Sequence, residues 1–549
     1  MKKLSTKSIL QFMLIVLLLC FFGVLYSQTT LTLPLFGDAT IHGANAIDVL
    51  IKGWTGLEAE YPAFYSYTMA LFYPFFGEKG FNMIPFIGFI FLLGGTFLFI
   101  RQLTKNYYLG LLSIILVGCS PKIIFYSARM YQEILIGAFF IFCIYLLFHY
   151  VETKKRIFLI LLAFFVGITL SIKQQGLFIL YPTIILFFII YFLKEKIFRK
   201  QIANIAIIIL FPLVIGMGFY GVLFHTTGKL QPGSNEFTAL EVINTFGQKL
   251  FSYQKKDSDT GDETLERALM TVETKYSKLA FKRAEERHIW PTDVFTDFDR
   301  FNQANNLYIP FQGITGNIFV TLALCIGLIG GFIYCLFHYK KYQDLLLFSF
   351  VFLPINYLLF VRNSDQQRYH LFVPIFLLAF VLVFFQIIFR RLHVPITTTL
   401  LITIPLMLLL FLPLLVPRIL LNTRWSNSQL YSPSEGGIAS IKEAGQWMQK
   451  KSNPTTIVGQ QCNNETHYYF QRPVVGDWRI YFLDPKNLQT YFMNKNISYY
   501  VIYTSQIVKD NEWVIICWVP ESFYKRMEEN YDRVYTTQSE DVIIYQVHH

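Results

Sequence analysis

The sequence predicts a polytopic α-helical membrane protein that carries a small α/β domain at its C-terminal end. Composition is the first indication, because the 549 residues are 54% hydrophobic and 18% aromatic, with 56 phenylalanines. The second is a series of long apolar runs, each long enough to cross about 30 Å of hydrocarbon. The third is a polar C-terminal tail in which helical and strand patterns alternate.

About eleven runs have the length and hydropathy of membrane spans. The first of them is not a cleaved signal peptide, because no small-residue cleavage site follows Tyr26. The predicted spans are 9–27, 83–100, 107–121, 131–150, 157–172, 176–193, 202–224, 313–337, 345–361, 371–389 and 396–416.

Basic residues predict the orientation of these spans. Clusters of Lys and Arg occupy alternate short loops, which the positive-inside rule places in the cytoplasm. The clusters are Lys2, Lys3 and Lys7; Arg101 and Lys105; Lys154, Lys155 and Arg156; Lys194, Lys196, Arg199 and Lys200; Lys340 and Lys341; and Arg390 and Arg391. We therefore expect a multi-pass protein of the cell (inner or plasma) membrane with its N-terminus inside and its C-terminus outside. These loops hold much of the net charge of +11, which therefore does not indicate a nucleic-acid partner.

Four segments of the chain follow from this arrangement. Residues 1–417 form the predicted transmembrane domain, in which 28–82 is a first outer loop with an interfacial helix. Residues 225–312 form a long outer loop with a helical stretch near its middle, and loops of this length are usually functional or mobile. Residues 434–549 form the predicted extracytoplasmic α/β domain.

The tail shows one apolar helix face and several short strand patterns. The face is Ile438, Ile441, Ala444 and Met448; the strands are 456–458, 499–503, 513–519 and 542–547; further helices are 488–494 and 522–530. Cys462 and Cys517 could form a disulfide if the tail faces an oxidising compartment. The tail carries no motif for catalysis of its own.

Asp38 lies where the first span leaves the membrane, directly before a segment with apolar residues at helical spacing. A carboxylate at this place, followed by an interfacial helix, suits chemistry on a lipid headgroup. The alternative is structural, because an aspartate is also a good N-cap for the helix that follows.

Basic residues on the opposite side from the cytoplasmic clusters break the pattern of the positive-inside rule. They are Lys122, Arg129, Lys173, Arg362 and Arg368, all at predicted outer ends of spans. Phosphate is the natural partner for such charges, whereas snorkelling to lipid headgroups is the structural alternative. Glu133 joins this set, and an ion pair with Arg129 at i, i+4 is its structural alternative.

Several local motifs together resemble the GT-C superfamily of membrane glycosyltransferases. The resemblance is greatest to its bacterial branch, the protein O-mannosyltransferase-like enzymes and lipid A aminoarabinose transferases of glycosyltransferase family 39. The matching positions are Asp38, Glu60-Tyr61-Pro62, Glu133, the stretch from Gly167 to Lys173, and Arg368-Tyr369 followed by Pro374. Two features depart from the family pattern. Ala39 stands where a second acid often follows the first, and the sequence lacks a Trp-Trp-Asp triplet, which argues against an N-glycosylation oligosaccharyltransferase.

The resemblance implies transfer of a sugar from a polyprenyl-phosphate donor to a hydroxyl of a lipid, glycan or protein acceptor. It places the reaction on the outer face. An inverting displacement needs a general base, for which we choose Asp38, with Glu133 as the second catalytic acid. It also needs positive charge on the departing phosphate. The predicted substrate-binding residues are Glu60, Tyr61, Arg129, Lys173, Arg368 and Tyr369. No cofactor is certain; a divalent metal ion held by Asp38 and Glu133 stays open.

Two other classes of function compete with this prediction. A membrane transporter or flippase also has many spans and isolated charges, although we find no internal repeat. A non-catalytic glycolipid-assembly protein would share the architecture. The observation that distinguishes these classes is whether Asp38, Glu133, Lys173 and Arg368 converge on one cavity, as the enzyme requires.

Overall fold

The computed structural model describes the chain at residues 6–30, 38–53, 64–120, 123, 127, 132–173, 176–195, 201–227, 265, 267–272, 318–356, 372–391, 438–460, 463–510 and 518–548. The chain divides into two compact units. The first contains Met1–Leu33, Asp48–Tyr253 and Asn305–Thr423; the second contains Pro34–Ile47, Gln254–Ala304 and Arg424–His549. The predicted span 396–416 and both tail cysteines, Cys462 and Cys517, lie outside the described residues.

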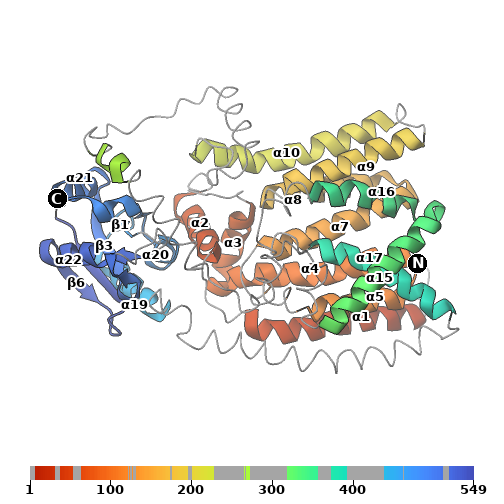
Figure 1. Cartoon of the computed structure of the whole chain (residues 1–549), viewed down its shortest axis with the longest axis horizontal. Helices are drawn as coiled ribbons and strands as arrows, with labels where there is room; N and C mark the ends of the chain where they lie inside the picture. The colour runs from red at the N-terminus through yellow and green to blue at the C-terminus, as the bar shows by residue number, and fades with distance from the viewer. Residues whose placement is uncertain are drawn as a thin grey trace. The chain divides into compact units, whose positions relative to one another are not determined.

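Apolar runs form the long helices of the first unit (Figure 1). These are α1 (Thr6–Thr30), α3 (Phe64–Phe76), α4 (Glu78–Thr104), α5 (Tyr107–Gly118), α7 (Gln132–Thr153), α8 (Arg156–Ile172), the π-helix η1 (Gly176–Leu180), α9 (Tyr181–Lys194), α10 (Ile202–Thr227), α15 (Ile318–Phe337), α16 (Tyr339–Asn356) and α17 (Phe372–Arg391). Every predicted span except 396–416 overlaps one or two of these elements within the described residues. Within the described residues, four helices are long and apolar enough to cross a membrane, and shorter apolar helices accompany them. The chain is a multi-pass membrane protein.

The helices of the first unit pack in pairs, chiefly α4 with α7, α8 with α10 and α15 with α17. Small residues at these contacts let helix backbones approach each other, as is usual in membranes. Gly331 of α15 is the clearest case, because a Cβ added there would lie 1.9 Å from the carbonyl oxygen of Phe380 in α17. Only glycine fits this crossing.

Aromatic side chains fill the centre of the first unit. Phe140 of α7 stacks on Phe372 of α17, with ring centroids 4.3 Å apart. The ring centroid of Phe352 of α16 lies 5.2 Å from that of Phe140 and 5.3 Å from that of Phe376. All four rings are buried, so phenylalanine is used here to join three helices that are distant in the sequence.

The helix ends with the predicted cytoplasmic charges contact one another. Lys105, after α4, forms a 2.5 Å ion pair with Glu152 near the end of α7. Gln386 of α17 donates a hydrogen bond to the backbone oxygen of Thr104 at 2.9 Å. Lys194 at the end of α9 contacts Gln343 near the start of α16. These contacts link helix ends that carry the predicted cytoplasmic charges, and the orientation of the spans stays a prediction.

Topology is testable directly. We expect a reporter fused after His549 to be extracytoplasmic and one inserted at Lys196 to be cytoplasmic, because the basic loops set the orientation. Paired alkaline phosphatase and fluorescent protein fusions measure this. The opposite result at either point contradicts the predicted orientation.

A five-stranded sheet forms the centre of the second unit. Its strands are β1 (Ile457–Gly459), β2 (Val474–Val475), β3 (Ile497–Tyr503), β6 (Asp532–Thr536) and β7 (Val542–Gln546), in the order β2-β1-β3-β7-β6. β1 runs parallel to β2 and β3, whereas β7 runs antiparallel to β3 and β6. A separate parallel pair consists of β4 (Ile507–Val508) and β5 (Val519–Pro520).

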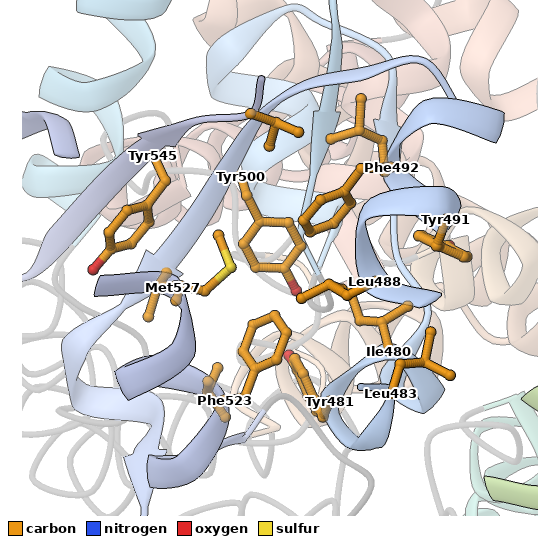
Figure 2. Close-up of a cluster of buried hydrophobic side chains, with 14 of the residues drawn as sticks. Ile480, Tyr481, Leu483, Leu488, Tyr491, Phe492, Tyr500, Phe523, Met527 and Tyr545 are labelled. Atoms are coloured by element: carbon orange, nitrogen blue, oxygen red, sulfur yellow. The ribbon is translucent and has the colours of Figure 1, made fainter. Parts of the chain in front are cut away.

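Helices α19 (Ile438–Lys451), α20 (Asn463–Phe470), α21 (Pro485–Asn494) and α22 (Glu521–Asn530) complete the second unit. Figure 2 shows the core on one face of the sheet, where Tyr500 of β3 lies among Phe492 of α21 and Phe523 of α22. Leu265, Leu269 and Val272 belong to the same buried cluster. This helical part of segment 225–312, the predicted long outer loop, therefore packs into the core that the C-terminal tail builds.

The expected elements of the tail have counterparts in the described residues. The predicted apolar face is found on α19, where Ile441, Ala444 and Met448 are buried. Predicted strands 456–458, 499–503 and 542–547 coincide with β1, β3 and β7, and only the end of 513–519 is described, as part of β5. The sequence did not predict β2, β6 or α20. The short β2 and the exposed start of β6 give no alternating apolar pattern.

Helix α2 (Asp38–Lys52) follows the first span, where the sequence predicts an interfacial helix. An interfacial helix would bury an apolar face and expose its polar side chains, and α2 does not follow this pattern. His42, Asn45 and Asp48 are buried, whereas Leu50 and Ile51 are exposed. Polar side chains on α2 are therefore covered together with the apolar ones.

Candidate functional site

The structure places two of the predicted site residues in direct contact, Glu133 and Lys173. Asp38 begins α2, and its side chain lies outside the described part of the structure. The other predicted substrate-binding residues, Glu60, Tyr61, Arg129, Arg368 and Tyr369, also lie outside it. Their roles stay predictions, and the site geometry is that around Glu133.

Glu133 and Lys173 form a buried ion pair between two helices of the first unit. The Nζ atom of Lys173 lies 2.5 Å from Oε1 of Glu133, and the side chains are 14% and 4% exposed. Glu133 lies in the first turn of α7, where the helix dipole favours a negative charge. The pair joins residues 40 positions apart. The pairing of Glu133 with Arg129 at i, i+4 stays a prediction, because Arg129 lies outside the described residues.

The position of Lys173 follows from a break between helices. α8 ends at Ile172, and Lys173 has an extended backbone (φ −159°, ψ 159°) as its C-cap. The π-helix η1 begins at Gly176, whose N–H donates to the Lys173 carbonyl at 3.0 Å. A Cβ at Gly176 would lie 2.4 Å from the Thr169 carbonyl oxygen. Glycine therefore allows the tight turn that presents Lys173, and π-helical turns often accompany functional sites.

Tyr65 of α3, outside the predicted spans, lies within electrostatic reach of Glu133. Burial is the main cause that raises the pKa of the Tyr65 hydroxyl, and the negative charge of Glu133 raises it further. The phenol therefore stays protonated and keeps a hydrogen to donate. The described part of the site thus consists of a carboxylate, an ammonium group and a neutral phenol.

This arrangement suits phosphate binding more than metal binding. An ammonium group carries a positive charge and three hydrogens to donate, which suits the oxygens of a phosphate. A divalent ion at Glu133 would meet the positive charge of Lys173 at close range. Among the described residues, no group of three or more His, Cys, Asp or Glu is placed to hold a metal.

Sequence reasoning missed Tyr65, and it missed the buried polar residues His42, Asn45 and Asp48 of α2. Tyr65 lies in an aromatic run in which no spacing distinguishes it from its neighbours. For α2 a signal exists: Asp38, His42, Asn45 and Asp48 recur at intervals of four, three and three residues, which places them along one side of a helix.

Comparison with known proteins finds one family model that matches part of the chain, and solved structures with a similar fold. Residues 60–219, which include Glu133 and Lys173, match the model of the dolichyl-phosphate-mannose-protein mannosyltransferase family. A search of curated proteins finds no match.

Among solved structures, the Archaeoglobus fulgidus oligosaccharyltransferase, tethered to an acceptor peptide containing the NVT sequon, is similar with a TM-score of 0.53 and 12% identity; the match covers 98% of this chain and 74% of that one. ArnT from Cupriavidus metallidurans bound to undecaprenyl phosphate gives a TM-score of 0.47 and 11% identity, over 96% of this chain and 97% of that one. The apo state of ArnT gives 0.47 and 12% over the same shares. The family match and the shared fold confirm the predicted resemblance to GT-C glycosyltransferases.

Proposed function

We propose, from the match of residues 60–219 to a family of mannosyltransferases, that this GT-C-like membrane protein is a glycosyltransferase. Its donor is a sugar on a polyprenyl phosphate, and its acceptor is a hydroxyl of a lipid, glycan or protein at the extracytoplasmic face. The observation that carries the proposal is the buried Glu133–Lys173 pair, which lies inside the matched segment. Buried charges at the ends of membrane spans are costly and usually functional.

The reaction is an inverting displacement at the anomeric carbon of the donor sugar. The acceptor oxygen attacks this carbon, its proton passes to the Asp38 carboxylate, and the bond to the phosphate oxygen breaks. Polyprenyl phosphate leaves with the bonding electrons. Lys173 and Arg368 stabilise the negative charge that develops on this leaving group, and Arg129 adds to it.

Glu133 then has a positioning role in addition to the catalytic role expected of it. Its carboxylate holds the Lys173 ammonium at 2.5 Å, which fixes the place of this positive charge in the proposed phosphate site. A side chain held in advance loses less entropy when the substrate binds. Glu60, Tyr61 and Tyr369 remain candidates for contacts with the sugar or acceptor.

Release of polyprenyl phosphate tests the proposed function. We expect purified protein in liposomes to release polyprenyl phosphate from a polyprenyl-phosphate-linked sugar, with transfer of the sugar to an acceptor hydroxyl. Chromatography of the lipid products and mass spectrometry of the acceptor measure both halves of the reaction. Movement of the intact lipid-linked sugar across the bilayer without cleavage contradicts the proposal and supports the flippase alternative.

A further inference from the structure

The sheet of the second unit reverses its winding direction at β1. From β1 the chain passes through α20 to β2 on one side, and from β2 through α21 to β3 on the other side of β1. The crossover helices cover opposite faces: Phe492 of α21 packs on Tyr500 of β3, whereas Thr466 of α20 contacts the hydroxyl of Tyr503. In open α/β sheets, ligands bind outside the carboxyl ends of the strands at such a switch point.

Glutamines with buried side chains follow the carboxyl ends of both strands at this switch point. Gln460 comes directly after β1 and is 2% exposed; Gln506 ends the turn Thr504–Gln506 after β3 and is 1% exposed. Within the described structure, Oε1 of Gln460 and both amide atoms of Gln506 have no hydrogen-bond partner.

Backbone contacts fix the direction of Gln460. Its N–H donates to the carbonyl of Val475 at 3.0 Å, which continues the pairing of β1 with β2. A Cβ on Gly459 would lie 2.5 Å from the Tyr500 ring, so residue 459 faces the core of Figure 2. Side chains alternate along a strand. Gln460 therefore points to the opposite face, where α20 and the Tyr503 hydroxyl lie.

Unpaired buried amides are unusual enough to need an explanation. Each buried polar group without a partner costs about 1–3 kcal/mol, and native proteins contain few of them. The groups left without partners at this edge include two acceptor oxygens and one amide donor. An inorganic anion offers no hydrogen to the acceptors, whereas a hydroxyl both donates and accepts.

We propose that the carboxyl edge between β1 and β3 binds a neutral carbohydrate, with the amides of Gln460 and Gln506 bonded to its hydroxyl groups. This site is separate from the proposed transfer reaction and does not depend on it. Because both side chains are covered in this structure, a sugar must displace the local packing before it reaches them. We therefore expect weak binding, with a Kd of about 1 mM.

Ligand-observed NMR on the full-length protein tests the proposal. The protein is held in a detergent without a sugar headgroup, and saturation-transfer difference spectra are recorded with methyl glycosides of mannose, glucose and galactose. Gln460→Leu and Gln506→Leu remove the amides at similar volume. The matched control is Gln489→Leu, at an exposed position of α21.

We expect at least one glycoside to bind the wild type and the control equally, and each buried variant to bind it about tenfold more weakly. The melting temperatures of the buried variants should not fall, because an apolar group of the same shape replaces an unpaired amide at little cost. Wild-type protein that binds none of the glycosides overturns the proposal. Equal binding by all variants, or displacement of the sugar by inorganic phosphate, does so as well.

Discussion

Replacing Asp38 with asparagine should abolish most transfer while leaving donor binding nearly unchanged. Asparagine keeps the size of the side chain but accepts no proton from the acceptor hydroxyl. General-base assistance is typically worth about 10²–10⁴-fold in rate, or roughly 3–5 kcal/mol of barrier. Single-turnover transfer measures the rate, and titration with a non-hydrolysable donor analogue measures binding.

Arg368→Ala provides the contrasting variant in the same assays. Its charge interacts with a phosphate that is present in both the ground state and the transition state, so its loss should weaken donor binding as well as slow transfer. The alternative for Asp38 is the helix cap of α2, and asparagine caps helices as well as aspartate does. Near-normal transfer by folded Asp38→Asn protein would therefore contradict the general-base assignment and favour the cap.

The helices of the first unit were predictable because membrane spans depend on a local property, the length of an apolar run. Clusters of basic residues in the short loops between these runs predict the orientation of the spans. Pairing between helices does not follow from such patterns. Phe140, Phe352 and Phe372 meet in one aromatic cluster, but 56 phenylalanines in the sequence offer no means of choosing these three.

The candidate site shows the same limit. Spacing made Arg129 the natural partner of Glu133, because i, i+4 neighbours share a helix face. The structure joins Glu133 to Lys173, through a turn that depends on Gly176 and a π-helix, and Arg129 lies outside the described residues. Residues on separate helices meet only through tertiary packing. The local periodicity of a single sequence does not show which of them will meet. The tail shows a similar contrast, since β1, β3 and β7 carry apolar patterns and the exposed start of β6 does not.

The Glu133–Lys173 pair gives a second large expected effect, on stability and transfer together. Lys173→Met leaves the Glu133 carboxylate buried without its ammonium partner, and Glu133→Met leaves the ammonium without its carboxylate. Removal of one member of a buried ion pair costs about 3–5 kcal/mol. We expect a marked fall in melting temperature for each single variant, together with loss of transfer.

The double variant Glu133→Met/Lys173→Met separates the structural role of the pair from its role in transfer. With both charges gone, apolar side chains of similar length fill the space and most of the lost stability should return. Transfer should not return, because the ammonium that stabilises the leaving phosphate is absent; we expect a rate at least about 10²-fold below wild type. The matched control is Lys105→Met/Glu152→Met, an ion pair whose side chains are 62% and 49% exposed and whose loss should change stability by about 1 kcal/mol or less. Thermal unfolding and single-turnover transfer measure both properties on all variants. A double variant that recovers stability and also transfers sugar at the wild-type rate would show that the pair only holds α7 to the end of α8, and Lys173 would lose its place in the proposed phosphate site.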